Sequence, residues 1–114
     1  MNLCVEIIDD IAVVTFYGNH LDATNHDEFR QAMAPMLDEN DKVLLDIGQL
    51  ETVDSSGLGT FAFCMRKIGE RKGKLVVCSA GPQVSTAFDL IHIDRMIDLY
   101  NTRDDALAAF QEAK

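Results

Sequence analysis

The chain has 114 residues, of which 47% are hydrophobic, and this composition supports one folded domain, residues 1–114, rather than a disordered segment. Its formal net charge of −9 argues against a protein that binds nucleic acid or an anionic membrane surface, because both require a basic face. The sequence has no basic start followed by an apolar stretch and no long apolar run, so we expect a cytoplasmic protein without signal peptide or membrane span.

The cysteines and histidines form no pattern typical of a disulfide framework or a metal site. Cys4, Cys64 and Cys78 are odd in number, form no Cys-x-x-Cys pair and lie in apolar runs, so we expect all three to be buried packing residues. The histidines are scattered and have no ligand partners at metal spacing. We therefore expect neither a metal nor a cofactor.

The first third of the chain predicts a β-hairpin and a helix. Two runs rich in β-branched residues, 3–8 and 11–17, are separated by two aspartates and are typical of a hairpin. In the helix that follows, Thr24 and Asp27 have the spacing of a capping pair, and Pro35 should kink or split the helix. The predicted core face of this helix consists of Phe29, Met33, Met36 and Leu37.

The middle of the chain predicts a buried strand followed by a second helix. Residues 42–47 contain an apolar core without alternation, which is typical of a strand covered on both faces. A helix should begin after residues 54–57, and Gly73, preceded by basic residues, should end it. Its predicted apolar stripe is Leu58, Phe61, Met65 and Ile68, and its basic cluster is Arg66, Lys67, Arg71 and Lys72.

The last third predicts strands at 75–78 and 96–100, each followed by a helix. Pro82 suits the first position of one helix, and Thr102 should cap the other. The whole order, β-β-α-β-α-β-α-β-α, is typical of an α/β domain with a mostly parallel sheet. The predicted core-facing residues are Val84, Ala87, Phe88 and Ile91 in the first helix and Leu107, Ala108 and Phe110 in the second.

A candidate functional segment, residues 53–59, lies at the start of the second predicted helix and reads Val-Asp-Ser-Ser-Gly-Leu-Gly. Gly57 and Gly59 are unusual there, because glycine inside a helix costs about 0.5–1 kcal/mol relative to alanine, and they suggest a close approach to the backbone. A helix N-terminus also accommodates an anion such as phosphoserine. On these grounds alone, ordinary capping by aspartate and serine is the simpler interpretation.

The motif Asp-Ser-Ser-Gly-Leu-Gly at residues 54–59 resembles the signature of STAS domains, specifically of bacterial anti-sigma factor antagonists. Residues 45–47 and Leu50 before the motif fit the family, as do residues 73–75 and Pro82 after it, so the resemblance covers essentially the whole chain. It implies a mixed, mostly parallel sheet of four or five strands with helices largely on one side.

The resemblance implies a regulator without catalytic activity. The unphosphorylated protein would bind an anti-sigma factor that is also a serine kinase, and a sigma factor or another client would be freed. Phosphorylation would end this binding, and a metal-dependent serine phosphatase would restore the binding form. The implied phosphoacceptor is Ser55, and the implied partner-binding residues are Asp22, Asp54, Ser55, Ser56, Gly57, Leu58 and Gly59. Because of the net charge, we expect a monomer or a weak dimer.

One segment departs from the family pattern and leaves other functions open. Family members commonly have Gly-Glu-Leu-Asp at the end of the hairpin, whereas residues 18–22 read Gly-Asn-His-Leu-Asp, so the Leu21-Asp22 pair is displaced by one residue. The partner can therefore differ from that of other family members, for example as a kinase that controls something other than a sigma factor. Two alternatives stand beside the switch: a STAS subunit that regulates a membrane transporter or lipid-transport complex, and a small enzyme that uses Cys64 or Asp54.

Overall fold

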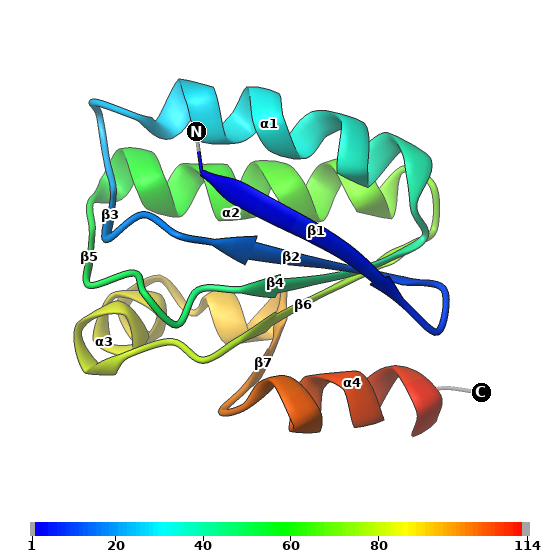
Figure 1. The fold of residues 1–114 in the computed structure, drawn as a ribbon. Coiled ribbons are helices and arrows are strands. Elements are labelled where there is room, and N and C mark those ends of the chain that lie inside the picture. Colours follow the sequence, from blue (N-terminus) through cyan, green and yellow to red (C-terminus); the bar gives the residue numbers. More distant parts are fainter. Residues whose placement is uncertain (1, 113–114) are drawn as a thin grey trace.

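The centre of the fold is a five-stranded sheet with the strand order β1-β2-β4-β6-β7 (Figure 1). The computed structural model describes residues 2–112. The strands β1 and β2 pair antiparallel, and the other neighbours in this sheet pair parallel, which confirms the predicted α/β fold with a mixed, mostly parallel sheet. The strands are β1 (Leu3–Ile8), β2 (Ile11–Phe16), β4 (Lys42–Asp46), β6 (Lys74–Cys78) and β7 (Asp98–Tyr100).

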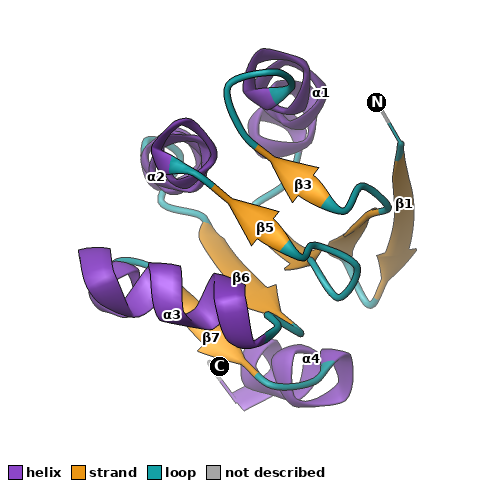
Figure 2. Cartoon of the chain, turned by 90° about the vertical axis from the view of Figure 1, so that its left-hand side faces the viewer, coloured by secondary structure: helices purple, strands orange, loops and turns teal. Residues whose placement is uncertain are grey.

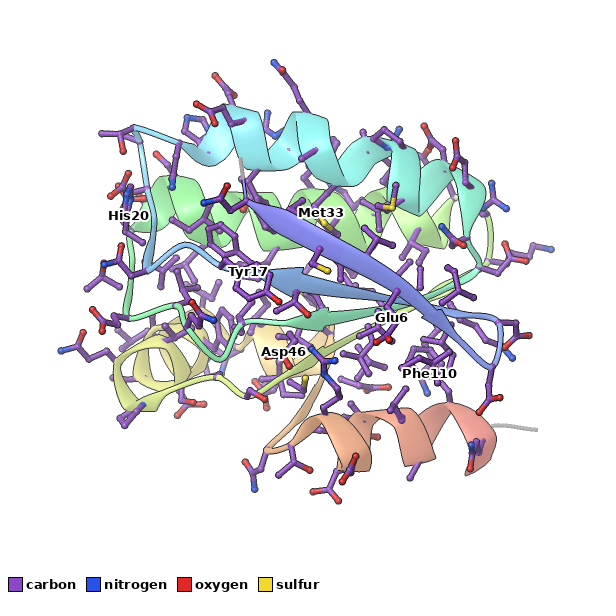
Figure 3. The ribbon with its side chains drawn as sticks, in the orientation of Figure 1. Glu6, Tyr17, His20, Met33, Asp46 and Phe110 are labelled. Carbon is purple, nitrogen blue, oxygen red and sulfur yellow. The ribbon has the colours of Figure 1, made fainter. Side chains whose placement is uncertain are left out.

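Within residues 2–112, four α-helices cover the sheet unevenly (Figure 1). Helices α1, α2 and α3 share one buried cluster with the side chains of Val14 and Leu45. On the opposite face, Ala106 and Phe110 of α4 pack against Leu44, and Figure 3 shows Phe110 between α4 and the sheet. The helices are α1 (His26–Glu39), α2 (Ser55–Gly69), α3 (Pro82–Ile91) and α4 (Arg103–Glu112), with a short 3-10 helix η1 (Ile93–Arg95).

The strand β4 lies between two layers of helices, as its sequence predicts. Val43, Leu44 and Leu45 are each 0% exposed, because successive side chains point to opposite faces and both faces are covered. The larger cluster is spanned by aromatic rings in series, with centroid separations of 5.2, 6.2 and 5.1 Å. These rings belong to Phe16, Phe29, Phe61 and Phe88.

A second, two-stranded sheet pairs β3 (His20–Leu21) with β5 (Thr52–Val53) in parallel (Figure 2). Neither strand is predictable from the sequence, because two residues are too few to show the alternation that identifies a strand. Leu21 is paired with Val53, and Leu21 is 0% exposed. This pairing fixes the segment after the hairpin against the segment before α2.

Helix α1 differs from its prediction at its start and in its middle. It begins at His26 with Asn25 as the N-cap residue, and the hydroxyl of Thr24 donates to Asp22 instead of capping the helix. The helix also continues through Pro35 without being split. Proline removes a single backbone donor, and burial of the predicted face before and after Pro35 holds both halves against the core.

The buried faces of the later helices are narrower than predicted. In α2, Phe61 and Ile68 are buried as expected, but Leu58 and Met65 are partly exposed, and the rest of the buried face is formed by Gly57, Thr60 and Cys64. In α3, Val84 and Phe88 are buried as predicted, whereas Ala87 is partly exposed and Ile91, at the end of the helix, is 47% exposed. In α4 the buried residues are Ala106, Ala109 and Phe110, whereas Ala108 is exposed and Leu107 is partly buried.

Several predicted ends of helices and strands are confirmed, and others lie at different residues. Pro82 is the first residue of α3, and Thr102 caps α4 by accepting a hydrogen bond from the amide of Asp105 at 3.1 Å. Helix α2 begins at Ser55, within the segment predicted to precede it, and it ends at Gly69, so Gly73 does not stop it. A side chain at Gly73 would lie 2.7 Å from the carbonyl oxygen of Asp41, so close approach explains that glycine. The last strand begins at Asp98 rather than at residue 96.

The start of α4 is fixed to the sheet by Arg103. Its Nε donates to Oδ2 of Asp46 at 3.1 Å, and its guanidinium also donates to the hydroxyl of Thr15 at 2.7 Å. Asp46 is labelled in Figure 3 beside the start of α4. The side chain of Asp46 is 16% exposed and that of Arg103 is 34% exposed, so the carboxylate is the better shielded partner. This contact joins residues far apart in the chain and was not predicted.

The three cysteines do not share one environment. Cys64 and Cys78 are buried as expected, but Cys4 is exposed because β1 is an edge strand, so the prediction for Cys4 is wrong. Burial raises the pKa of the Cys64 thiol to about 12 and the pKa of the Cys78 thiol to about 11. Both thiols are therefore protonated at neutral pH, which does not favour a nucleophilic role for Cys64.

We expect a thiol reagent at about pH 8 to modify Cys4 in the folded protein and to spare Cys64 and Cys78. The thiolate is the reactive form, and the raised pKa values of the two buried cysteines keep them protonated at that pH. Mass spectrometry of the labelled protein measures this, and the variant Cys4→Ser should remain unlabelled until it is unfolded. Labelling of Cys64 or Cys78 in the native state would contradict the prediction.

Candidate functional site

The start of α2 and the loop of residues 19–25 lie side by side because β3 and β5 pair in parallel (Figure 2). Leu21 pairs with Val53, and the next residues in the two strands are Asp22 and Asp54. Parallel strands run in the same direction, so both aspartates emerge at the same end of the pair. The residues that the sequence singles out at positions 22 and 54–59 therefore belong to one region of the molecule.

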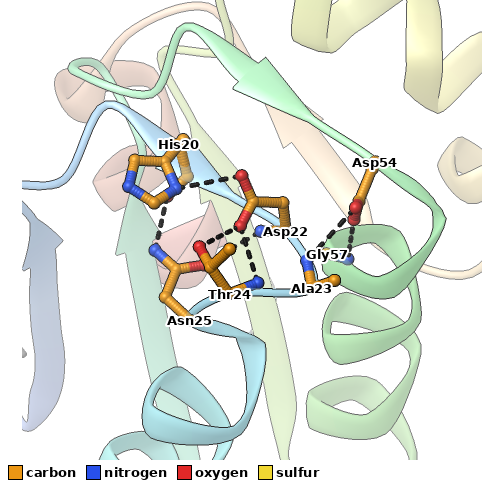
Figure 4. A network of polar contacts seen from close by, with 7 residues as sticks. All are labelled: His20, Asp22, Ala23, Thr24, Asn25, Asp54 and Gly57. Atoms are coloured by element: carbon orange, nitrogen blue, oxygen red, sulfur yellow. Dashed lines mark hydrogen bonds and ion pairs between the residues drawn. The ribbon is translucent and has the colours of Figure 1, made fainter.

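Asp54 is the N-cap residue of α2, and both oxygens of its carboxylate accept hydrogen bonds (Figure 4). Oδ1 accepts from the amide of Gly57 at 2.9 Å, which satisfies a backbone donor in the first turn of the helix. Oδ2 accepts from the amide of Ala23 at 3.2 Å, in the 19–25 loop. The predicted capping role is confirmed, and the second bond adds a connection between two segments.

Asp22 organises the 19–25 loop from within (Figure 4). Its Oδ1 accepts hydrogen bonds from both the hydroxyl and the amide of Thr24, and its Oδ2 lies 3.1 Å from Nδ1 of His20. The hydrogen bond from the Thr24 hydroxyl is the largest cause that lowers the pKa of the Asp22 carboxyl, followed by the Thr24 amide and then by the charge of His20. The carboxylate therefore stays ionised, and keeps these bonds, at any pH above its lowered pKa.

Asn25 closes the other side of the same loop. Its side-chain oxygen accepts from the amide of Asp22 at 2.9 Å, and its side-chain nitrogen donates to the carbonyl oxygen of His20, also at 2.9 Å. These roles of Thr24 and Asn25 were not predicted from the sequence. The run Asp-Ala-Thr-Asn at 22–25 could have revealed part of this network, because aspartate commonly accepts from amides two residues further along in turns.

The two serines of the motif differ in exposure. Ser55 is the first residue of α2 and is exposed, whereas Ser56 is partly buried. The first turn of α2 contains no acidic residue, and Asp54 immediately precedes it. Because the Gly57 amide already donates to Asp54, an anion on Ser55 would find that donor occupied and a carboxylate beside it. The geometry therefore favours a group on Ser55 that points outward.

The two glycines of the motif have different surroundings. Gly57 is buried, and a Cβ atom there would lie 2.1 Å from the carbonyl oxygen of Leu21 and 2.6 Å from a methyl group of Val53. Gly59 is exposed, and a Cβ atom there would meet nothing within 4 Å. The close approach inferred from sequence is thus internal to the fold at Gly57, whereas the backbone at Gly59 is open. Leu58, between them, packs partly against the core.

Neither a metal site nor a membrane-spanning helix is found in the described part of the chain. Among residues 2–112, no three histidine, cysteine, aspartate or glutamate side chains come together in a group that could hold a metal ion. None of the helices in that part combines the length and the apolar character needed to cross a bilayer.

A family model of the STAS domain matches residues 2–106. The chain is 25% identical over 114 residues to an anti-sigma F factor antagonist from Paenibacillus polymyxa, with 97% of each sequence covered.

Solved structures share the fold. The structure matches an anti-sigma factor antagonist from Mycobacterium paratuberculosis with a TM-score of 0.85 and 29% identity, covering 95% of this chain and 92% of that chain. It also matches the phosphorylated form of the Bacillus cell fate determinant SpoIIAA, with a TM-score of 0.71 and 17% identity over 96% of this chain and 99% of that chain. The chain belongs to the STAS domain family.

Proposed function

We propose that this protein is a phosphorylation-controlled partner switch of the anti-sigma factor antagonist type. In its unphosphorylated form it binds an anti-sigma factor that is also a serine kinase, and this binding frees a sigma factor or another client. Phosphorylation of Ser55 ends the binding, and a metal-dependent serine phosphatase restores it. The protein is the substrate of the kinase and the phosphatase and needs no cofactor of its own.

The observation that carries this proposal is the exposed hydroxyl of Ser55 beside an ordered loop. Ser55 begins α2, and the amide of Ala23, in the 19–25 loop, is bonded to the residue before it. A kinase can reach an exposed serine, and a partner that covers Ser55 would also contact the loop and the open backbone at Gly59. One sequence relative and one solved structure are anti-sigma factor antagonists by name, and a second solved structure of this fold is a phosphorylated form.

Charge and composition support the remaining parts of the proposal. A net charge of −9 favours a partner with a basic docking surface and disfavours self-association, so we propose a monomer or weak dimer in the cytoplasm. Sedimentation of the purified protein tests this. A mass of twice the chain that does not change with concentration would indicate a stable dimer and contradict the proposal.

We expect the cognate kinase to place phosphate on Ser55 and not on Ser56. Ser55 is exposed, whereas the partly buried Ser56 is less accessible to a kinase active site. Phosphopeptide mapping after incubation with kinase and ATP identifies the site. The matched control is Ser56→Ala, which should remain a substrate, while Ser55→Ala should not. Phosphate found on Ser56 alone would end this mechanism.

A further inference from the structure

The carboxylate of Asp54 joins two segments that are 31 residues apart in the chain, because its two oxygens accept from Gly57 in α2 and from Ala23 in the 19–25 loop (Figure 4). A serine at the N-cap position would satisfy the helix donor equally well, since serine, asparagine and aspartate are similar caps. Capping alone therefore does not require a side chain with two acceptor oxygens. We call these two hydrogen bonds the Asp54 clamp.

We propose that Asp54 is a positioning residue, which holds the 19–25 loop against the start of α2 so that the loop and Ser55 present one continuous docking surface. This inference rests on the proposed function, because it assigns to Asp54 an indirect role in binding the kinase partner. The family resemblance implies that Asp54 contacts the partner, and in this structure each oxygen of its carboxylate already accepts one hydrogen bond from within the protein.

Residues 22–25, which follow β3, are the part of the loop whose position depends on the clamp, because residues 20 and 21 are already paired with β5. Their internal hydrogen bonds join Asp22 to Thr24 and to Asn25, so their own shape does not depend on α2. The entry of the loop is anchored by Leu21, which is buried and pairs with Val53. Beyond Leu21, the amide of Ala23 reaches out of the loop to Asp54. Loss of that bond should leave residues 22–25 folded but free to shift relative to Ser55, while β3 stays paired with β5.

Two substitutions break the clamp from opposite ends. Asp54→Ser keeps an acceptor for the Gly57 amide but is too short to serve Ala23 as well. Ala23→Pro keeps Asp54 and removes the donor. Ala23 is the second residue of a turn closed by the bond from the Asn25 amide to the Asp22 carbonyl oxygen, at 3.2 Å, and proline is favoured at that position of a turn.

Amide hydrogen exchange tests the clamp without any partner. In Asp54→Ser the Ala23 amide should exchange at least about tenfold faster than in the wild type, while the Gly57 amide remains protected. Asp54→Asn is a second variant with the same logic, since its oxygen can accept from Gly57 but its NH2 group cannot accept from Ala23. Unchanged exchange at Ala23 in both variants would overturn the proposal.

The consequence for binding is tested by a double-mutant cycle with the kinase captured on the Ser55→Ala form. Asp54→Ser and Ala23→Pro should each weaken binding about tenfold, and the double variant should be no weaker than either one, because both remove the same bond. If the double variant instead loses affinity by the product of the two single losses, the positioning role is wrong. If the wild type binds no such kinase, the proposed function fails, and the exchange experiment still decides whether the clamp exists.

Discussion

Placing negative charge on Ser55 should reduce the affinity for the kinase partner at least about a hundredfold and leave the fold intact. A phosphate adds a charge of about −1.5 to −2, and a partner surface that covers Ser55 must remove its hydration. Where the part of the partner that covers Ser55 carries no basic group, burying the phosphate costs several kcal/mol, and about 3 kcal/mol already lowers affinity more than a hundredfold. The carboxylate of Asp54, the preceding residue, repels the phosphate, and this repulsion becomes stronger when a partner removes water from both groups.

The fold should tolerate the same charge, because Ser55 is exposed at a helix start. Charges near a helix N-terminus change stability by about 0.3–1 kcal/mol, which is small against the roughly 5–15 kcal/mol that hold a domain together. Calorimetric titration of the phosphorylated protein, of Ser55→Asp and of Ser55→Ala measures the effect, and thermal melts provide the control. Ser55→Ala should bind constitutively. Undiminished binding by the phosphorylated protein would contradict the switch.

Substituting the two glycines of the motif should give opposite changes in stability. Gly57→Ala should destabilise the domain by about 2 kcal/mol, because the new Cβ would lie 2.1 Å from the Leu21 carbonyl oxygen and the β3–β5 pair must shift. A loss of this size lowers the Tm by roughly 10 °C in a domain of this length. Gly59→Ala should instead stabilise α2 by about 0.5–1 kcal/mol, since its Cβ meets nothing within 4 Å.

The matched pair also separates stability from binding. Gly59→Ala should weaken binding of the kinase about tenfold despite its higher stability, because a methyl group would occupy backbone surface on which we propose that the partner packs. Denaturant unfolding and titration on the same preparations measure both quantities. A Gly57→Ala protein as stable as the wild type would show that β3 moves freely. An unchanged affinity for Gly59→Ala would place Gly59 outside the interface.

The sequence by itself determined the elements whose signals are local. The apolar run of β4, the β-branched hairpin and the helical spacing of Phe29, Met33 and Leu37 were each sufficient to predict the correct element. The caps at Thr102 and Asp54 were also predictable, because a cap bonds to amides within a few residues of itself. The motif at 54–59 marked the start of α2, and the family match confirmed the resemblance that it carried.

The tertiary structure alone decided which distant residues meet. The β3–β5 pair, the bond between Asp54 and Ala23 and the contact between Arg103 and Asp46 each join segments more than 30 residues apart, and no periodicity records such a pairing. The exposure of Cys4 follows from the position of β1 at the sheet edge, which depends on strand order rather than on the apolar run around it. Local spacing fixes which face of an element is apolar, but packing against the rest of the chain fixes how much of that face is covered.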